Sequence, residues 1–266
     1  MQIKKLHIAF FSPTHSTRNT LRNITKGIAA EGVKEVEFHN LTLPAGREKP
    51  IEIPEDELLL IGMPVYGGRV PGMFQAGINI TGKGPAVCVA VYGNRHYDDA
   101  LLELTDLTTE KGFHVIAGAA FIAQHSLNPV MAAGRPDIQD IRKEMDFGKA
   151  VIGKLAAAET NASFERVEVK GNPQYKPYNP VIFAPQLIRE RCISCRICAG
   201  ACPVQIINYD DFTVADPSKC IFCIACVTFC PRDARSISQP EKEMFEARMA
   251  QLAGMNAERK EPEIFI

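Results

Sequence analysis

Residues 192–203 read CISCRICAGACP, and residues 220–231 read CIFCIACVTFCP. Both stretches follow the pattern C-x-x-C-x-x-C-x-x-x-C-P, with corresponding cysteines 28 positions apart, from Cys192 to Cys220. Eight of the nine cysteines belong to this repeat, and the ninth, Cys88, lies in an apolar run. Because no secretion signal is recognisable, we interpret the eight as reduced thiols that bind metal rather than as disulfides.

The spacing of the cysteines in the repeat distinguishes a zinc site from an iron–sulfur cluster. Zinc sites are commonly built from Cys-x-x-Cys pairs. Here each copy adds a third cysteine after another two-residue gap and then a Cys-Pro dipeptide. Three thiolates at this spacing lie on one tight loop, where each can reach one iron of a cubane cluster, while the fourth points toward the other copy. The repeat therefore favours iron–sulfur clusters over zinc.

This segment resembles the bacterial-type ferredoxin family over about fifty residues, with every ligand position filled. The resemblance implies two 4Fe–4S clusters, one-electron transfer and crossed ligation of the clusters. Cluster one would be held by Cys192, Cys195, Cys198 and Cys230, and cluster two by Cys220, Cys223, Cys226 and Cys202. Crossed ligation would tie the two copies together and add stability that a small apolar core lacks.

Strand and helix patterns alternate along the chain before the repeat. Strands are predicted at 5–11, 36–41, 58–64, 85–93 and 114–123, and the first is a near-continuous apolar run, as expected for a strand buried on both faces. Helical spacing follows the first strand, recurs at 98–111, and begins again at Pro136, with Ile138, Ile141, Met145, Ile152 and Leu155 on the expected buried side. This alternation predicts a doubly wound α/β domain with a five-stranded parallel sheet. Ligands of such domains bind at the carboxyl ends of the strands.

The first of those strand ends carries a loop rich in hydroxyl groups, SPTHSTRNT at 12–20. A strand, a hydroxyl-rich loop and a helix form the arrangement that holds a phosphate at a helix N-terminus. The loop lacks the G-x-x-x-x-G-K-[ST] motif of nucleoside-triphosphate sites and the G-x-G-x-x-G motif of dinucleotide sites. Both of those ligand classes are therefore excluded for this loop.

The loop at 12–20 is similar to the phosphate loop of flavodoxin, which binds FMN through hydroxyls and amides. Ser12, Thr14, Ser16 and Thr17 match that loop, and His15 stands where the family usually has glycine. Two further loops follow the third and fourth strands. They contribute Pro64, Val65, Tyr66 and Gly67, and then Gly93, Asn94, Arg95 and Tyr97. The resemblance implies that Tyr66 and Tyr97 approach the flavin ring.

Several of these residues have a second interpretation. His15 suits a left-handed backbone better than most residues, so it is either a turn residue facing solvent or an imidazole near the phosphate. Tyr66 could instead cap the sheet edge, and His96 competes with Tyr97 for the ring. His125, after the fifth strand, is either a proton donor to flavin or substrate, and thus our candidate catalytic residue, or a structural hydrogen-bonding group.

These patterns divide the chain into four parts. They are a flavodoxin-like FMN-binding domain at 1–170, a proline-rich linker at 171–180, a small α+β ferredoxin-like domain at 181–240, and a C-terminal helix and tail at 241–266. This order resembles the ferredoxin-fused flavodoxin-like proteins of anaerobes. The resemblance implies an iron–sulfur flavoprotein that reduces a small molecule or a partner at the flavin. The alternative is an electron-transfer module for another protein, with no substrate of its own or with FMN lost.

Charge and hydropathy limit which classes of binding partner and which cellular location we expect. The formal net charge of −1 gives no case for nucleic-acid binding, and no apolar run approaches the roughly 20 residues that span a bilayer. We therefore predict a soluble cytoplasmic protein. Arg191, Arg196, Lys219 and Arg232 adjoin the cysteines, and they form either an ordinary solvated surface or a docking face for an acidic redox partner such as a free ferredoxin. The oligomeric state is open, with a homodimer among the alternatives.

Overall fold

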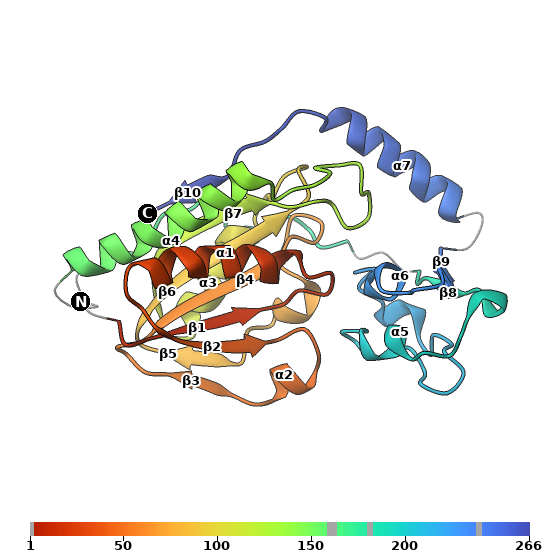
Figure 1. Ribbon diagram of the computed structural model, residues 1–266, viewed down its shortest axis with the longest axis horizontal. Coiled ribbons are helices and arrows are strands. Elements are labelled where there is room, and N and C mark those ends of the chain that lie inside the picture. The colour runs from red at the N-terminus through yellow and green to blue at the C-terminus, as the bar shows by residue number, and fades with distance from the viewer. Residues whose placement is uncertain (1–2, 159–163, 180–182, 238–240) are drawn as a thin grey trace.

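The computed structural model describes residues 3–158, 164–179, 183–237 and 241–266. A layered α/β unit is formed by the N-terminal half, and a smaller cysteine-rich unit lies beside it (Figure 1). The C-terminal segment passes over the cysteine-rich unit as a helix and then returns to the α/β unit (Figure 1). The predicted boundaries at 180–181 and at 240 lie outside the described residues.

The α/β unit is built on a six-stranded sheet in the order β10-β7-β6-β4-β1-β2. Its strands are β1 (Lys5–Phe10), β2 (Glu35–Asn40), β4 (Leu58–Pro64), β6 (Pro85–Tyr92), β7 (His114–Ile122) and β10 (Glu263–Phe265). The first five are the predicted strands, and neighbours among them pair in parallel. Numbered along the chain, their order is 2-1-3-4-5, the order of flavodoxin-like doubly wound folds. The fold class is therefore confirmed.

The sixth strand was not predicted. The short β10 pairs antiparallel with β7, with Ile264 opposite Ala119. It covers an edge of the sheet that would otherwise present unpaired backbone groups. A separate two-stranded parallel sheet of β3 (Ile51–Ile53) and β5 (Ile80–Gly82), the helix α2 (Ala45–Glu48) and the turn η1 (Gly72–Phe74) complete the unit.

Helices cover both faces of the sheet. They are α1 (Ser16–Ala30) and α4 (Ile138–Ala157), which pack together, and α3 (Ala100–Glu110) on the other face. The buried side of α4 agrees with the prediction only in part: Leu155 is buried as predicted, but Ile138 is 62% exposed, and Glu144, Phe147 and Val151 are buried as well. The helices approach closely at Gly148, where an added Cβ would lie 2.3 Å from the Ile24 carbonyl oxygen.

The cysteine-rich unit contains short elements around a small core. They are β8 (Gln186–Leu187), η3 (Arg189–Arg191), α5 (Ile197–Gly200), η4 (Pro217–Lys219), α6 (Ala225–Thr228) and β9 (Arg235–Ser236). β8 and β9 pair antiparallel. Its buried apolar core consists of Ala199, Cys202, Ile206, Ile207 and Phe212.

The predicted linker packs against the α/β unit. The Asp99 carboxylate accepts hydrogen bonds from the backbone N–H groups of Asn172 and Lys176, at 2.7 and 2.6 Å. Arg69 lies over the ring of Tyr175, with its guanidinium carbon 4.8 Å from the ring centroid. Residues 171–179 therefore form an ordered part of the larger unit's surface.

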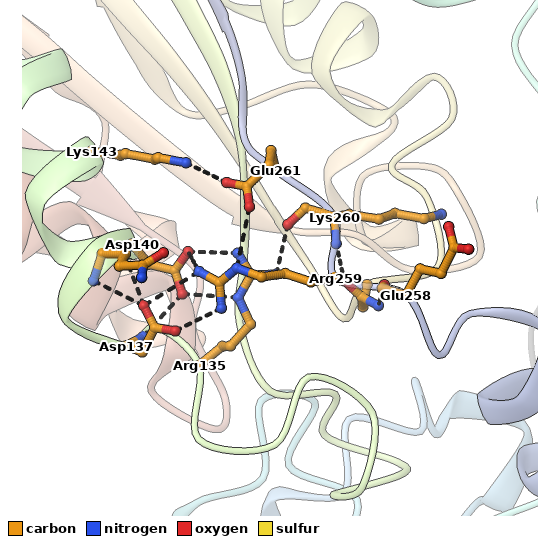
Figure 2. Close-up of polar contacts among 10 residues, drawn as sticks. Arg135, Asp137, Asp140, Lys143, Glu258, Arg259, Lys260 and Glu261 are labelled. Carbon is orange, nitrogen blue, oxygen red and sulfur yellow. Dashed lines mark hydrogen bonds and ion pairs between the residues drawn. The ribbon is translucent and has the colours of Figure 1, made fainter.

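The C-terminal segment consists of α7 (Glu241–Met255) and residues 256–265, which we call the strap. Figure 2 shows the strap held to the α/β unit: Arg259 bridges Asp137 and Asp140, and Lys143 pairs with Glu261. The strap thus fixes the far end of α7. Within the part of the chain that the structure describes, every helix is too short or too polar to span a lipid bilayer.

Candidate redox site

The structure gathers the eight repeat cysteines into two groups. Cys192, Cys195, Cys198 and Cys230 line one small cavity, in which all four residues assigned to cluster one face a common space. In the second group, burial raises the pKa of the Cys223 thiol, and the neighbouring thiols of Cys226, Cys202 and Cys220 add to this rise. The crossed ligand sets that the ferredoxin resemblance implies use these same two groupings, and the assignment of each set to one cluster stays a prediction.

The backbone of the two copies repeats as well. Ser194, Arg196 and Gln205 in the first copy have positive φ angles of 55°, 62° and 51°. The corresponding Phe222, Ile224 and Asp233 have φ angles of 52°, 54° and 48°. Left-handed backbone is strained for residues other than glycine, above all for a β-branched one such as Ile224. Loops that keep this strain at equivalent points fit the wrapping of two similar rigid clusters.

Donors surround the cysteine sulfurs. The Ala234 N–H donates to Cys230 Sγ at 3.1 Å, and the Phe222 N–H donates to Cys220 Sγ at 3.4 Å. Arg235 is buried, with Nη2 3.6 Å from Cys198 Sγ. Hydrogen bonds to sulfur and nearby positive charge are the groups that tune a cluster's potential. The sequence shows only one more arginine at position 235, so its burial beside a sulfur could not be predicted.

The hydroxyl-rich loop between β1 and α1 is tightly held. Ser12 Oγ accepts a hydrogen bond from the Arg18 N–H at 3.1 Å, and the Thr14 and Ser126 hydroxyls are 3.0 Å apart. His15 has φ 70°, the left-handed conformation that suits the glycine of the family motif. The replacement of that glycine therefore leaves the turn intact.

His15 does not project freely into solvent. Its ring centroid lies 4.8 Å from that of Phe229, the residue before Cys230. Burial lowers the pKa of His15, and Arg18 and Arg22 lower it further, so the imidazole is neutral near pH 7. The interpretation as a solvent-facing turn residue is wrong, because the side chain packs against the cysteine-rich unit.

The start of α1 suits a phosphate. Three polar atoms of α1 are buried without a hydrogen-bond partner among the described residues: Thr17 Oγ1, Arg18 Nε and Thr20 Oγ1. Buried polar groups in native proteins are rarely left unpaired. Thr17 and Arg18 lie in the first turn of this 15-residue helix, whose N-terminus is electropositive. Ser16 lines the adjoining cavity. This donor set fits the monophosphate of FMN.

That cavity, of about 780 Å³, lies between the two units and α7. Predicted flavin-loop residues line it, namely Pro64, Val65, Tyr66, Gly67, Gly93 and Arg95, together with Ser16 and His125. Cys223 of the cluster-two group lines it as well. The cavity therefore joins the predicted flavin site to one of the two cysteine groups.

Tyr66 lies where these two sites meet. Its ring packs edge-on against Phe11, with centroids 6.4 Å apart. Burial raises the pKa of Tyr66 well above its usual value, and Cys223, Tyr178 and Cys220 contribute in that order. Tyr66 is therefore a neutral aromatic group beside the cluster-two loop.

Two residues that were predicted to contact flavin form hydrogen bonds to the C-terminal segment instead. The Tyr97 ring is only 1% exposed, and its hydroxyl donates to Glu263 at 3.0 Å. Tyr97 does not line the cavity, whereas its competitor His96 does, so the predicted Tyr97 contact with flavin is wrong. The Asn94 amide donates to the Asn256 and Glu258 carbonyl oxygens of the strap, both at 2.8 Å.

His125 lies at the cavity wall. Burial lowers its pKa, and nearby Arg95 lowers it further. Its Nδ1 accepts a hydrogen bond from the Leu127 N–H at 3.1 Å, so the neutral ring carries its proton on Nε2. A Cβ added to Gly93 would lie 2.4 Å from His125 Cδ2, and this close approach explains the glycine.

Other cavity residues were missed in the sequence. They are the linker residues Lys176, Pro177 and Tyr178, the cysteine-unit residues Phe183, Ile221 and Phe222, and the α7 residues Met244, Phe245, Arg248, Met249 and Leu252. The spacing of the α7 residues, at three and four positions, was a signal for one helix face, but it gave no indication of what that face covers.

Residues 191–235 match the family model of the 4Fe-4S dicluster domain. A ferredoxin of Methanothermococcus thermolithotrophicus is 38% identical over 47 residues, 17% of this chain and 78% of that protein. A polyferredoxin-like protein of Methanocaldococcus jannaschii is 36% identical over 59 residues. This chain spans only 35% of that second protein.

Among solved structures, a flavodoxin from the domain Archaea superposes with a TM-score of 0.38 and 14% identity, covering 57% of this chain and 99% of that one. A flavone reductase gives a TM-score of 0.41 and 13% identity, covering 59% and 66%. The strand order of the sheet, rather than these low scores, identifies the fold of the larger unit. The chain belongs to the 4Fe-4S dicluster ferredoxin family through residues 191–235, which follow a flavodoxin-like α/β unit.

Proposed function

We propose that this protein is an iron–sulfur flavoprotein that passes electrons between two 4Fe–4S clusters and FMN. One observation carries the proposal: Cys223 of the cluster-two group and Tyr66 and Gly93 of the flavin loops line the same cavity. A flavin there would exchange electrons with a cluster held in the same chain. The internal step would then need no collision with a carrier.

The two cysteine groups suggest the direction of the route. The cluster-one cavity is lined only by residues between Leu187 and Arg235, all from the cysteine-rich unit. Electrons would enter there, pass to cluster two, and reach the flavin across the shared cavity. Tyr66 and the residues of α7 would exclude water from this crossing.

FMN, when bound, supplies the means to accept single electrons and to pass on one electron or a hydride equivalent. The chain's own residues would do the rest. Ser16, Thr17 and the first amides of α1 would hold the phosphate. His125, neutral with its proton on Nε2, would donate a hydrogen bond, or that proton, within the cavity.

The cavity walls favour a reductase with its own small-molecule acceptor over a module that serves only another protein. A carrier that meets its partner at an exposed flavin edge needs no large cavity beside that edge. Here three aromatic rings, those of Phe183, Phe222 and Phe245, line a cavity of the size that holds small ligands. We therefore propose a flat, largely apolar electron acceptor, reduced in the cytoplasm.

The donor would dock at cluster one. Arg196 and Arg232 line its cavity, are exposed, and have no ion-pair partner among the described residues. They fit an acidic protein such as a free ferredoxin. Replacing both with glutamate should slow reduction by an acidic ferredoxin about tenfold or more at low salt; an unchanged, salt-insensitive rate would discard this partner.

The central test is anaerobic purification with iron, sulfide and flavin analysis, for which we expect about eight irons and one FMN per chain. Thr17→Val should weaken FMN binding about tenfold, because one donor to the phosphate is lost. Thr20→Val is the matched control, since Thr20 is equally buried in the same helix but one turn further along. A reconstituted protein that takes up iron but no flavin would refute the proposal.

A further inference from the structure

Two histidines and two glutamates meet on β1, β2 and the residue before β4. His7 Nδ1 lies 2.8 Å from His39 Nε2, and the Glu37 carboxylate oxygens lie 4.0 Å from each of these nitrogens. The three ligand atoms all lie within 4.8 Å of one another. None of these residues lines the redox cavity or the cluster-one cavity.

Strand register produces this cluster. His7 pairs directly with Glu37 across the parallel β1–β2 ladder, and His39 follows two residues later on β2. Residues two apart on a strand point to the same face, so Glu37 and His39 lie side by side next to His7. Three strand-borne side chains form a more rigid set than loop residues would.

Glu57 completes the arrangement. Its carboxylate accepts a hydrogen bond from His7 Nε2, which leaves the lone pair of Nδ1 directed at His39. A carboxylate on the far nitrogen of a histidine is the partner that usually orients a metal-binding imidazole. The side chains of His7 and Glu57 are 5% and 17% exposed, so the hydrogen bond is largely shielded from water.

We propose that His7 Nδ1, His39 Nε2 and the Glu37 carboxylate bind one divalent transition-metal ion, with Zn²⁺ the best match. Two imidazoles and one carboxylate form a common zinc donor set with a fourth position for water. The Glu37 side chain is 47% exposed, which leaves that position accessible. The ion would tie the edge strand β2 to β1.

The distances between the three proposed ligand atoms would need only small changes to admit a zinc ion. Tetrahedral zinc with bonds of about 2.0–2.1 Å places its ligand atoms about 3.3 Å apart. The nitrogens, now 2.8 Å apart, would separate slightly, and the Glu37 oxygens, now at 4.0 Å, would move inward. One competitor is present: Lys5 pairs with Glu37 through Oε2. Removing the lysine charge should therefore strengthen binding.

The test uses the full-length protein with its iron–sulfur sites filled, equilibrated with Zn²⁺ alone and passed through a desalting column. We expect one zinc per wild-type chain and none in His39→Ala. Glu57→Gln should weaken binding about 10- to 100-fold, and Lys5→Met should tighten it. His114→Ala, at an exposed histidine on another strand, is the matched control and should keep the zinc.

Zinc K-edge absorption identifies the donors, because zinc–nitrogen and zinc–oxygen bonds of about 2.0–2.2 Å differ from zinc–sulfur bonds of about 2.3 Å. A shell of nitrogen and oxygen alone supports the site. A sulfur shell, zinc retained by His39→Ala, or no zinc on the wild-type protein would each overturn the proposal. Iron and flavin content should not change in any arm, so the outcome is independent of the redox function.

Discussion

The α/β unit and the cysteine-rich unit are held together in different ways. The larger unit buries apolar side chains on both faces of its sheet, including Leu60 and Phe121 on one face and Ile61 on the other. The smaller unit has a buried core of five residues, one of them the cysteine Cys202. A core of that size cannot offset the entropy of ordering the chain. Apolar burial therefore stabilises the first unit, whereas metal–thiolate bonds must stabilise the second.

Breaking one crossed ligand should give the largest effect. Cys202→Ser would remove one of the two links between the copies, Cys230 being the other, and with it much of the metal-binding energy that folds such a unit. We expect loss of hydrogen-exchange protection throughout 183–237 and loss of at least half the iron, while the sheet of the larger unit keeps its protection.

The matched control is the cysteine of the other unit. Cys88 is buried in β6, where burial raises the pKa of its thiol to about 12, so it stays protonated and packs as an apolar group. Cys88→Ala should cost the larger unit about 1–2 kcal/mol and leave the iron content unchanged. Protection of 183–237 in an iron-free Cys202→Ser protein would contradict the distinction between the units.

The second-largest effect is expected from a substitution that disturbs helix packing in the larger unit. In Gly148→Ala the new methyl would meet the backbone of α1, 2.3 Å from the Ile24 carbonyl oxygen, and the helices would have to separate. We expect destabilisation of about 2–4 kcal/mol in denaturant unfolding. Gly153→Ala on the same helix meets nothing within 4 Å and should stabilise by about 0.5–1 kcal/mol. Equal effects of the two substitutions would show that close helix contact is not what Gly148 provides.

The fold of both units could be predicted because it follows from local patterns. Alternating strand and helix patterns predicted the five parallel strands, and the cysteine spacing predicted the repeat. The buried side of α4 could be predicted only in part: Leu155 lies on it as expected, but Gly148, which meets α1, and Glu144, which accepts a hydrogen bond from Asn23, carry no apolar signal. β10 was missed because three residues far from the sheet in sequence carry no signal of the edge that they join.

The residues of the redox site also differ in how far local sequence patterns could predict them. The cysteines, which act through their own chemistry, could be identified from the spacing of the repeat. Tyr97 could not be assigned correctly, because an aromatic residue in a flavin loop and one anchoring a distant strap look alike in sequence. The α7 wall of the cavity depends on how the units pack, which no local pattern encodes.

A third prediction concerns a buried carboxyl group in the larger unit. Burial raises the pKa of Glu144 to about 7, although Asn23 donates to it at 2.7 Å. The folded state then holds a proton that the unfolded state has lost between roughly pH 4.5 and 7, so this group's contribution to stability falls as pH rises through that window. Glu144→Gln, which stays neutral, should be the more stable protein by about 2 kcal/mol at pH 8.

The measurement is denaturant unfolding of the larger unit at pH 5 and pH 8. The advantage of Glu144→Gln should be small at pH 5 and grow toward pH 8, because the wild-type carboxyl ionises only at the higher pH. Asp146→Asn, at an exposed position on the same helix, should show little change with pH. An advantage that is the same at both pH values would refute the buried, protonated carboxyl.

The smallest effect concerns the strap, which connects the two units through α7. Asn94 has φ 63° and holds the strap by two donated hydrogen bonds and one accepted from the Lys260 N–H at 3.3 Å. Asn94→Gly removes the side chain but keeps the left-handed backbone, so the lost hydrogen bonds are isolated from strain. We expect a cost of about 1 kcal/mol and roughly fivefold to tenfold faster hydrogen exchange in 256–265. Asn79→Ala removes two exposed hydrogen bonds elsewhere and should leave hydrogen exchange in the strap unchanged. Equal exchange rates of 256–265 in both variants would mean that α7 is held by its cavity contacts rather than by the strap.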